Sequence, residues 1–283
     1  MTSPNHAGQH PYFEPPRPRV LAHRGLTYSV ADATSTADAT MQGASLPDIA
    51  LPDNTILSFE RAISAGAEYL EIDVHGTRDG IAVVSHDPDL VRLTGRRESI
   101  AELSFAELAA IELGRQQRFS SLGEILARFP TTRLNIDIKA PLAVAGTVLA
   151  VHDARAHERV LIASFSERRR RAVVRQLPGV ATSASYIRVA LALVAANLRL
   201  SGGVRLALRG IHAVQIPLRA GRIPLLTPRL VEAIHRAGAE VHIWTINDRA
   251  TMERLLDLGI DGLVTDRADV AVQLLEERSL SHP

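Results

Sequence analysis

The chain has no cysteine among its 283 residues, so neither a disulfide framework nor thiol chemistry is available to it. This absence fits a reducing compartment. The first 18 residues are rich in Pro and His and lack the apolar core of a secretory signal peptide. No apolar run reaches the ~18 residues that a membrane-spanning helix requires, and Arg188, Asn197 and Arg199 interrupt the longest candidate, Ile187 to Leu200. We therefore expect a soluble, cytoplasmic protein.

A surplus of charge is also missing. The net charge of +1 argues against nucleic acid as the main partner, because such binding needs a concentrated basic surface. Lysine is nearly absent, since the chain holds 31 arginines and one lysine, Lys139. In a chain that uses Arg so consistently, the remaining lysine indicates a place that needs a compact ammonium group and not a guanidinium fork. Chance retention of this lysine is the alternative.

No glycine-rich phosphate loop follows the first apolar strand, which disfavours an open doubly wound sheet. Strand patterns instead alternate with helix patterns to the end of the chain. The predicted strands begin near residues 20, 69, 133, 160, 180, 213, 241 and 262. Eight parallel strands with intervening helices close into a (β/α)8 barrel, so we predict an α/β protein of this class.

A single domain over residues 18–278 accommodates this pattern, because 46% hydrophobic content supplies one large core. We expect residues 1–17 to be a flexible tail and residues 279–283 to be a second tail. Residues 88–130 are predicted to be an insertion after the second strand. Residues 26–51 have few bulky side chains and are predicted to be a long loop that shapes access to the functional end of the barrel.

The stretch over residues 71–87 predicts a strand, a tight turn and a returning strand. Asp79-Gly80 is a dipeptide strongly favoured for a two-residue hairpin turn. In the register of such a turn Asp73 faces His86, and opposite residues project to the same side. Glu71 shares that face because it lies two residues before Asp73. The alternative is an ordinary surface hairpin with its polar side chains in solvent.

Catalytic side chains in a (β/α)8 barrel lie at the C-terminal ends of the strands. The ionisable residues predicted there are His23, Arg24, Glu71, Asp73, His86, Asp137 and Lys139. Carboxylates from adjacent strands suit Mg²⁺ or Ca²⁺, which prefer oxygen ligands, and the two basic side chains suit a phosphate. The two imidazoles can divide the base and acid roles near neutral pH.

Together these groups predict a phosphodiester cleavage site. Each residue also has a structural interpretation. Asp73 with Arg24, or Asp137 with Lys139, would then be an internal ion pair, and His23 would be a core histidine.

Motifs of one known family occur in order from residue 19 to about residue 270. They are His23-Arg24-Gly25, Pro52-Asp53-Asn54-Thr55, Glu71-Ile72-Asp73-Val74, Asp79-Gly80, His86-Asp87, Asn135-Ile136-Asp137-Ile138-Lys139, Ser164-Phe165, Trp244-Thr245-Ile246-Asn247-Asp248, Gly259-Ile260-Asp261-Gly262 and Thr265-Asp266. In these motifs the sequence resembles the glycerophosphodiester phosphodiesterases.

The resemblance implies a barrel of the phospholipase C-like phosphodiesterase type with one divalent cation, Mg²⁺ or Ca²⁺, and Mn²⁺ as a third candidate. By this resemblance the metal ligands are Glu71, Asp73 and Asp137, the acid–base pair is His23 and His86, and the phosphate-binding residues are Arg24 and Lys139. The implied reaction is hydrolysis of a small glycerophosphodiester to glycerol phosphate and an alcohol. The alternatives are a phospholipase D-like enzyme for lysophospholipids or sphingolipids and a non-catalytic phosphate- or headgroup-binding barrel.

The chain departs from the family pattern at Asp53 and Asp137, where the family usually has Glu. Each side chain is shorter by one carbon, which is about 1.5 Å of reach. The loop between Gly25 and Pro52 is also longer than usual. Five residues are predicted to line the substrate pocket or to support it, namely Asp53, Asn54, His75, Gln215 and Trp244. For Trp244, core packing is the alternative.

The sequence allows contact with a membrane but does not indicate it. Arg168 to Arg171 favour an anionic lipid surface less than they favour a solvated helix face. The apolar segment Ile187 to Leu200 is interpreted as a barrel-packing helix with an exposed edge, with a lipid-contacting lid as the alternative. The sequence makes no prediction of oligomeric state.

Overall fold

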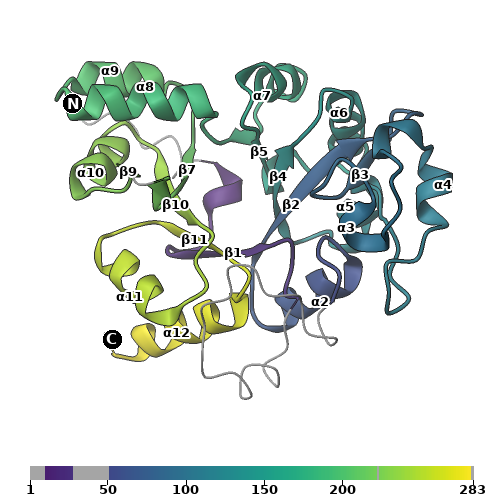
Figure 1. Cartoon of the computed structure of the whole chain (residues 1–283). Helices are drawn as coiled ribbons and strands as arrows, with labels where there is room; N and C mark the ends of the chain where they lie inside the picture. Colours follow the sequence, from purple (N-terminus) through teal and green to yellow (C-terminus); the bar gives the residue numbers. More distant parts are fainter. Residues whose placement is uncertain (1–9, 28–50, 222, 282–283) are drawn as a thin grey trace.

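The computed structural model describes residues 10–27, 51–221 and 223–281. Within these ranges, eight parallel strands stand in a ring with helices around it (Figure 1). The strands are β1 (Arg19–His23), β2 (Tyr69–Gly76), β4 (Arg133–Ile138), β5 (Val160–Ala163), β6 (Ala181–Thr182), β7 (Ala213–Pro217), β10 (Glu240–Trp244) and β11 (Gly262–Thr265). Their order is β6-β5-β4-β2-β1-β11-β10-β7, and a parallel bridge between Ser183 and Ala213 joins the two ends. The predicted (β/α)8 barrel is confirmed.

Alternation along β2 decides which side chains enter the barrel. Leu70, Ile72 and Val74 are fully buried in the apolar layer between the strands and the helices. Successive side chains of a strand point to opposite faces, so Glu71 and Asp73 turn into the barrel. The same pleat that builds the core therefore carries two carboxylates inward.

The helices cover the outside of this ring (Figure 1). The longer ones are α2 (Ile56–Ser64), α5 (Leu122–Arg128), α6 (Ala143–Asp153), α7 (Glu167–Val174), α8 (Tyr186–Asn197), α10 (Pro228–Arg236), α11 (Arg249–Asp257) and α12 (Ala268–Ser281). Because α12 continues to Ser281, the predicted tail at 279–283 is wrong for its first three residues. Of the helices in the described part of the chain, none combines the length and apolarity needed to cross a membrane.

Residues 10–17 do not form the flexible tail that was predicted for them. Pro11–Phe13 is a short 3-10 helix, η2, and both Tyr12 and Phe13 are buried in the cluster that fills the N-terminal end of the barrel. His10 contacts the carbonyl oxygen of Gly179 through Nε2 at 2.6 Å, which links this segment to a residue distant in the chain. Residues 1–9 and most of the predicted loop 26–51 lie outside the described residues.

The predicted hairpin is present, but its register is shifted by one residue. Strand β3 (Ala82–Val84) returns along β2, with His75 opposite Val83. The hydroxyl of Thr77 donates to Asp79 Oδ1 at 2.6 Å, and the backbone N–H of Thr77 donates to Ile81 O at 3.0 Å. Three residues therefore form the loop, a common alternative to the two-residue turn. The predicted pairing of Asp73 with His86 is wrong.

The segment predicted as an insertion, residues 88–130, contains α3 (Val91–Thr94), η3 (Ile100–Glu102), α4 (Phe105–Ala109) and α5. Its first part has a small core of its own, to which Leu90, Ile100 and Leu108 belong. Helix α5 instead joins the main core through Leu122 and Ile125. The added structure is thus confined to residues before α5.

Between β6 and α10, a helix and a ribbon were not predicted. The helix α9 (Ser201–Ala207) follows α8 and packs against it. A two-stranded ribbon of β8 (Arg219–Ala220) and β9 (Ile223–Pro224) follows β7. Both lie in the part of the chain that leads from β6 to α10.

The side chain of Glu167 links α7 to α8 through hydrogen bonds. Its carboxylate accepts hydrogen bonds from Arg170 Nε at 2.8 Å, Arg188 Nε at 3.1 Å and Ser185 Oγ at 2.8 Å. Burial alone would raise the pKa of Glu167, but the hydrogen bonds from Arg170 and Ser185 lower it to about 2.

Replacing Glu167 with Gln is expected to destabilise the protein in a pH-dependent way. A depressed carboxyl pKa stabilises the fold fully above the unfolded value of 4.5, and that contribution is lost as the pH falls toward about 2. The difference in free energy of unfolding between wild type and Glu167→Gln should therefore shrink over this window. Denaturant unfolding at several pH values measures it, and a difference that does not change with pH would contradict the assignment.

Candidate active site

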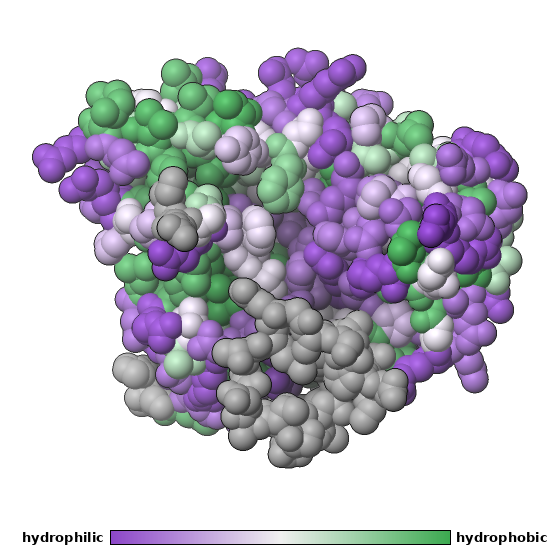
Figure 2. Space-filling view, viewed as in Figure 1, coloured by the Kyte–Doolittle hydropathy of each residue, from purple (hydrophilic) through white to green (hydrophobic). Residues whose placement is uncertain are grey.

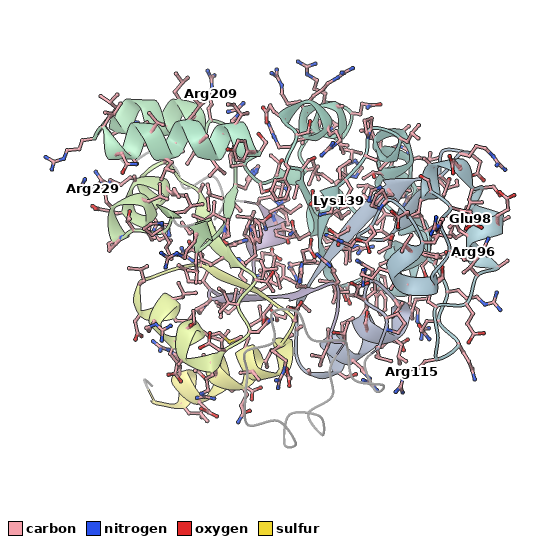
Figure 3. All side chains as sticks on the ribbon, in the orientation of Figure 1. Arg96, Glu98, Arg115, Lys139, Arg209 and Arg229 are labelled. Carbon is pink, nitrogen blue, oxygen red and sulfur yellow. The ribbon has the colours of Figure 1, made fainter. Side chains whose placement is uncertain are left out.

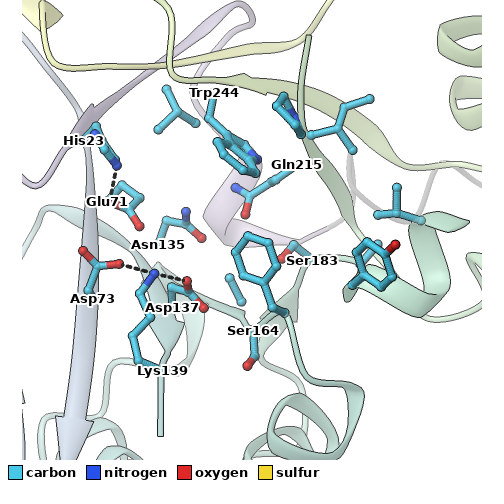
Figure 4. A pocket seen from close by; sticks show the side chains of 18 of the residues that line it. His23, Glu71, Asp73, Asn135, Asp137, Lys139, Ser164, Ser183, Gln215 and Trp244 are labelled. Atoms are coloured by element: carbon cyan, nitrogen blue, oxygen red, sulfur yellow. Dashed lines mark ion pairs between the residues drawn. The ribbon is translucent and has the colours of Figure 1, made fainter. Parts of the chain in front are cut away.

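A pocket of about 320 Å³ opens at the C-terminal ends of the barrel strands (Figure 4). Its walls include every residue predicted for the site except Asp53, Asn54 and His75. The predicted residues that line it are His23, Arg24, Glu71, Asp73, His86, Asp137, Lys139, Gln215 and Trp244. Residues far apart in the chain therefore meet in one cavity.

Three carboxylates form the floor of the pocket. Asp73 on β2 and Asp137 on β4 are register partners, and Glu71 precedes Asp73 by two residues on the same face. All three are buried, with Asp73 only 1% exposed. Such a concentration of acid groups needs compensation by positive charge, by protons or by a cation.

Lys139 and Arg24 compensate part of this charge. Lys139 Nζ lies 2.8 Å from Asp73 Oδ1 and 2.7 Å from Asp137 Oδ2, and Arg24 Nε lies 3.1 Å from Asp73 Oδ2. Burial would raise the pKa of Asp73, but Lys139 and Arg24 hold it below its usual value. The internal ion pairs that the sequence left open are thus present, and both basic side chains also line the pocket.

The compensation is incomplete at the other two carboxylates. Burial and the neighbouring charge of Asp73 raise the pKa of Glu71 to about 8, and burial raises the pKa of Asp137. Among the described residues, Glu71 Oε2 and Asp137 Oδ1 have no hydrogen-bond partner although both atoms are buried. Buried oxygens without partners are costly, so these two atoms are ready to bind a proton or a cation.

Each histidine of the pocket is held by a carboxylate. His23 Nδ1 lies 2.6 Å from Asp266 Oδ1, and His86 Nδ1 lies 2.8 Å from Asp87 Oδ1. With the Nδ1 proton donated to the aspartate, Nε2 of each ring carries the lone pair. His23 Nε2 lies 4.0 Å from Glu71 Oε2. Burial would lower the pKa of His23, but Asp266 and Glu71 raise it.

Asp87 and Asp266 stand within the motifs quoted from the sequence, but neither was given a role there, and the structure shows that each contacts a pocket histidine. Asp266 could have been found from the barrel closure, because β11 pairs with β1 and places Thr265 beside Ala22. The next residues along the two strands are Asp266 and His23. Asp87 directly follows His86, and this adjacency within the His86-Asp87 motif was its signal.

The three predicted residues outside the pocket lining support it from behind. Asn54 Nδ2 donates to Asp73 Oδ2 at 3.1 Å, and His75 Nε2 lies 3.1 Å from the carbonyl oxygen of His86. Asp53 forms ion pairs with Arg24 at 3.5 Å and with Arg92 at 3.1 Å. These contacts fix the positions of groups that do face the cavity.

The opposite wall of the pocket is apolar. The rings of Phe165 and Trp244 meet edge to face, with their centroids 6.0 Å apart. Tyr186 and Val189 of α8 extend this wall, and Gln215 lies on the same side, where its Nε2 contacts His242 Nδ1 at 3.3 Å. The cavity thus has an ionic half and an apolar half (Figure 4).

Comparison with known proteins agrees with this geometry. The sequence matches the model of the Glycerophosphoryl diester phosphodiesterase family over residues 23–270. The chain belongs to this family. It is therefore an enzyme of the phosphoric diester hydrolase class.

Two curated members of the family illustrate its range. A Mycobacterium tuberculosis protein named probable glycerophosphodiester phosphodiesterase 2 is 40% identical over 229 residues, covering 81% of this chain and 87% of that protein. A Rattus norvegicus protein named lysophospholipase D is 27% identical over 251 residues, covering 76% of this chain and 79% of that protein.

One solved structure has a fold similar to that of the present chain. It is an Oleispira antarctica phosphodiesterase in complex with the product sn-glycerol-3-phosphate. The TM-score is 0.68 at 22% identity, and the match covers 92% of this chain and 97% of that one.

Proposed function

We propose that this phosphodiesterase hydrolyses small glycerophosphodiesters to glycerol phosphate and an alcohol, with a divalent cation and with His23 and His86 as acid and base. The observation that carries the proposal is the pair of histidine–aspartate contacts, at 2.6 and 2.8 Å, in the same pocket as one carboxylate cluster. The product held by the structural relative from Oleispira antarctica is consistent with a glycerophosphodiester substrate.

The cation requirement rests on the donor atoms. Among the residues that the structure describes, no three His, Asp or Glu side chains are grouped tightly enough to coordinate one ion, and Lys139 bridges Asp73 and Asp137. The chemistry of the donors nevertheless fits, because all are carboxylate oxygens and two of them are buried without partners. We assign Glu71, Asp73 and Asp137 as ligands of Mg²⁺ or Ca²⁺, with Mn²⁺ as a third candidate. A bound cation would polarise the phosphoryl oxygens.

The phosphate is assigned to Arg24 and Lys139. Both side chains line the pocket, and both form ion pairs with Asp73. Charge-assisted hydrogen bonds from such groups hold a phosphate diester and stabilise the negative charge that develops on its oxygens. The sole lysine of the chain thus has a role that fits a compact ammonium group.

Proton transfer is assigned to the two histidines. In its neutral form, each imidazole donates Nδ1–H to its aspartate and can accept a proton at Nε2; in its charged form, it can donate that proton. One histidine removes a proton from the attacking hydroxyl, and the other protonates the leaving alkoxide. Both rings are held by an aspartate through Nδ1, so these contacts by themselves leave either role to either histidine.

The aspartates orient the imidazoles, so Asp266→Asn and Asp87→Asn are expected to lower kcat by at least about tenfold and to change KM much less. An amide can hold the other tautomer, which turns the wrong nitrogen toward the substrate. Steady-state kinetics on a glycerophosphodiester measure both constants.

A matched control lies outside the pocket. Asp153 contacts His152 Nδ1 at 3.3 Å on the exposed end of α6, so it is an aspartate beside a histidine with no part in the site. Asp153→Asn should keep wild-type kcat. If Asp266→Asn and Asp87→Asn kept the same kcat as Asp153→Asn, the two aspartates would not position the imidazoles.

A second candidate substrate class is favoured by the apolar half of the pocket. Tyr186 and Val189 extend the wall made by Phe165 and Trp244, and an acyl chain would find its contacts there. The rat relative named lysophospholipase D fits this class. The chemistry would be the same, with lysophospholipids or sphingolipids in place of soluble diesters.

A panel of phosphodiesters, assayed with Mg²⁺, Ca²⁺ and Mn²⁺ in turn, tests the proposal. Release of glycerol phosphate from soluble glycerophosphodiesters, faster than headgroup release from lysophospholipid, is the expected result. Faster turnover of lysophospholipid would favour the second candidate. Binding of the diesters without turnover under every cation would instead indicate a non-catalytic binding barrel.

A further inference from the structure

Helix α8 carries its large apolar side chains on the outside. Ile187, Leu191, Val194 and Leu198 recur at a helical spacing of four, three and four residues, so they form one stripe. Leu191, Val194 and Leu198 are 54%, 57% and 63% exposed. The buried residues of α8 are small, namely Ala192, Ala195 and Ala196, and the partly buried Val189 and Leu193 pack against the core as well. Most of the large apolar side chains of this helix nevertheless face outward.

The stripe is part of a larger apolar surface. Of the twelve large hydrophobic side chains that are exposed among the described residues, seven lie between Tyr186 and Leu206. Figure 2 shows them gathered over α8 and α9 at the upper left of the molecule. We call this surface, made by Ile187, Leu191, Val194, Leu198, Leu200 and Leu206, the α8–α9 face. A concentration of this kind marks an interaction site.

The α8–α9 face stands in a strongly basic part of the chain. Residues 168–231 contain twelve arginines and no Asp or Glu, although the whole chain has a net charge of only +1. In the ranges that the structure describes, Arg199, Arg205, Arg209 and Arg229 are exposed and form no ion pair. Figure 3 shows Arg209 and Arg229 on the side of α8 and α9, away from Arg96 and Arg115.

A groove beside the face gathers several of these arginines. It has a volume of about 820 Å³ and runs between α8, α9 and α10, with Arg199, Arg205 and Arg229 in its walls. Glu232 also lines it, but this carboxylate is paired with Arg236 at 3.0 Å. The groove therefore offers uncompensated positive charge next to exposed apolar side chains.

The face also continues into the active-site pocket. Tyr186 is 71% exposed at the start of α8 and lines the pocket as well, together with Val189. Whatever covers the α8–α9 face therefore lies next to the mouth of the catalytic cavity.

We propose that the α8–α9 face binds the surface of a bilayer that contains anionic lipids, with the apolar stripe among the acyl chains and the arginines at the headgroups. An apolar face bordered by arginines is the pattern of an interfacial helix. Anionic headgroups attract such arginines, and the attraction is screened by salt. A second copy of the chain fits less well, because two identical basic segments repel each other. This proposal is independent of the substrate assigned above.

Co-sedimentation of the full-length protein with vesicles tests the proposal. Binding is expected with vesicles of phosphatidylcholine and phosphatidylglycerol, and much less with phosphatidylcholine alone or at high salt. The double substitution Leu191→Ser and Leu198→Ser should weaken this binding by at least about tenfold. Arg199→Gln with Arg205→Gln should weaken it and reduce its salt dependence.

The controls are exposed residues elsewhere. Leu149→Ser with Leu280→Ser, on α6 and α12, and Arg97→Gln, near α3, should bind vesicles as wild type does. All variants should hydrolyse a soluble phosphodiester at the wild-type rate, which shows that they are folded.

Two results would overturn the proposal. One is binding to anionic vesicles no stronger than to phosphatidylcholine, or lost equally in the control variants. The other is a concentration-dependent dimer, seen by analytical ultracentrifugation without vesicle binding and abolished by Leu191→Ser with Leu198→Ser. That outcome would show that the α8–α9 face is a dimer interface.

Discussion

Replacing either His23 or His86 with alanine is expected to lower turnover of a glycerophosphodiester by about 10²- to 10⁴-fold. Each imidazole lines the pocket, and each is fixed through Nδ1 by an aspartate, so Nε2 is the atom left for proton transfer. Removing one ring takes away either the base that activates the nucleophile or the acid that protonates the leaving group. Initial rates with a soluble diester measure the loss.

His152→Ala is the matched control for this experiment. His152 also contacts a neighbouring aspartate, Asp153, but its side chain is 74% exposed on α6 and has no access to the pocket. It should turn over substrate as wild type does. Near-normal turnover by both His23→Ala and His86→Ala would contradict the mechanism.

Removal of divalent cations is expected to abolish activity, and one of Mg²⁺, Ca²⁺ or Mn²⁺ is expected to restore it. The physical reason lies in the buried oxygens of Glu71 and Asp137 that have no partner, and in the raised pKa of both carboxyls. A cation that binds only the folded protein also stabilises it, by about 2.7 kcal/mol at a concentration 100 times its Kd. Thermal unfolding of the chelated protein with and without added cation measures this second effect.

The variants Glu71→Gln and Asp137→Asn should lose most of that stabilisation, because each removes one charged ligand. Glu276→Gln is the control, since Glu276 is an exposed glutamate on α12 far along the chain from the carboxylate cluster. It should keep the full thermal shift. Activity that survives exhaustive chelation, or a thermal shift that is equal in all of these variants, would contradict the assigned cation site.

The barrel and most of its pocket could be predicted because both follow from short-range patterns. Strand alternation sends Leu70, Ile72 and Val74 toward the helices and sends Glu71 and Asp73 inward, which is visible in the sequence. The rule that chemistry lies at the C-terminal ends of barrel strands then brings Asp137 and His23 to the same place.

The hairpin register could not be predicted, because a side chain decides it. The Asp79-Gly80 dipeptide favours a two-residue turn, but Thr77 Oγ1 donates to Asp79 and accepts from Ile81 N at 2.9 Å, which closes a longer loop. Ser85 and not His86 consequently bonds to Asp73, through its N–H to Asp73 O at 3.0 Å. His86 still lines the pocket, but from beyond the end of β3.

The N-terminal segment was misjudged for a different reason. Local composition suggests a solvated tail, whereas Tyr12 and Phe13 are buried against side chains contributed by distant strands. The hydroxyl of Tyr69 donates to Tyr12 O at 3.0 Å, and Arg19 Nη2 donates to Phe13 O at 2.8 Å. Such tertiary contacts override local preference and have no signature in a short window of sequence.

Asp53 and Asp137, where the resemblance led us to expect Glu, have different surroundings in the structure. Asp53 does not line the pocket. Its carboxylate forms ion pairs with both Arg24 and Arg92, so the shorter side chain still reaches its partners. Asp137 faces the cavity and keeps one oxygen without a partner. In the proposed cation site, a water molecule would supply the reach that the shorter side chain of Asp137 lacks.

Cation-dependent hydrolysis can be followed by phosphorus NMR of a glycerophosphodiester such as glycerophosphocholine, incubated with the protein and each of Mg²⁺, Ca²⁺ and Mn²⁺. The phosphodiester resonance should be replaced by that of glycerol phosphate with at least one cation, and His23→Ala and His86→Ala should slow this conversion. A phosphodiester resonance that stays unchanged under all three cations would contradict it.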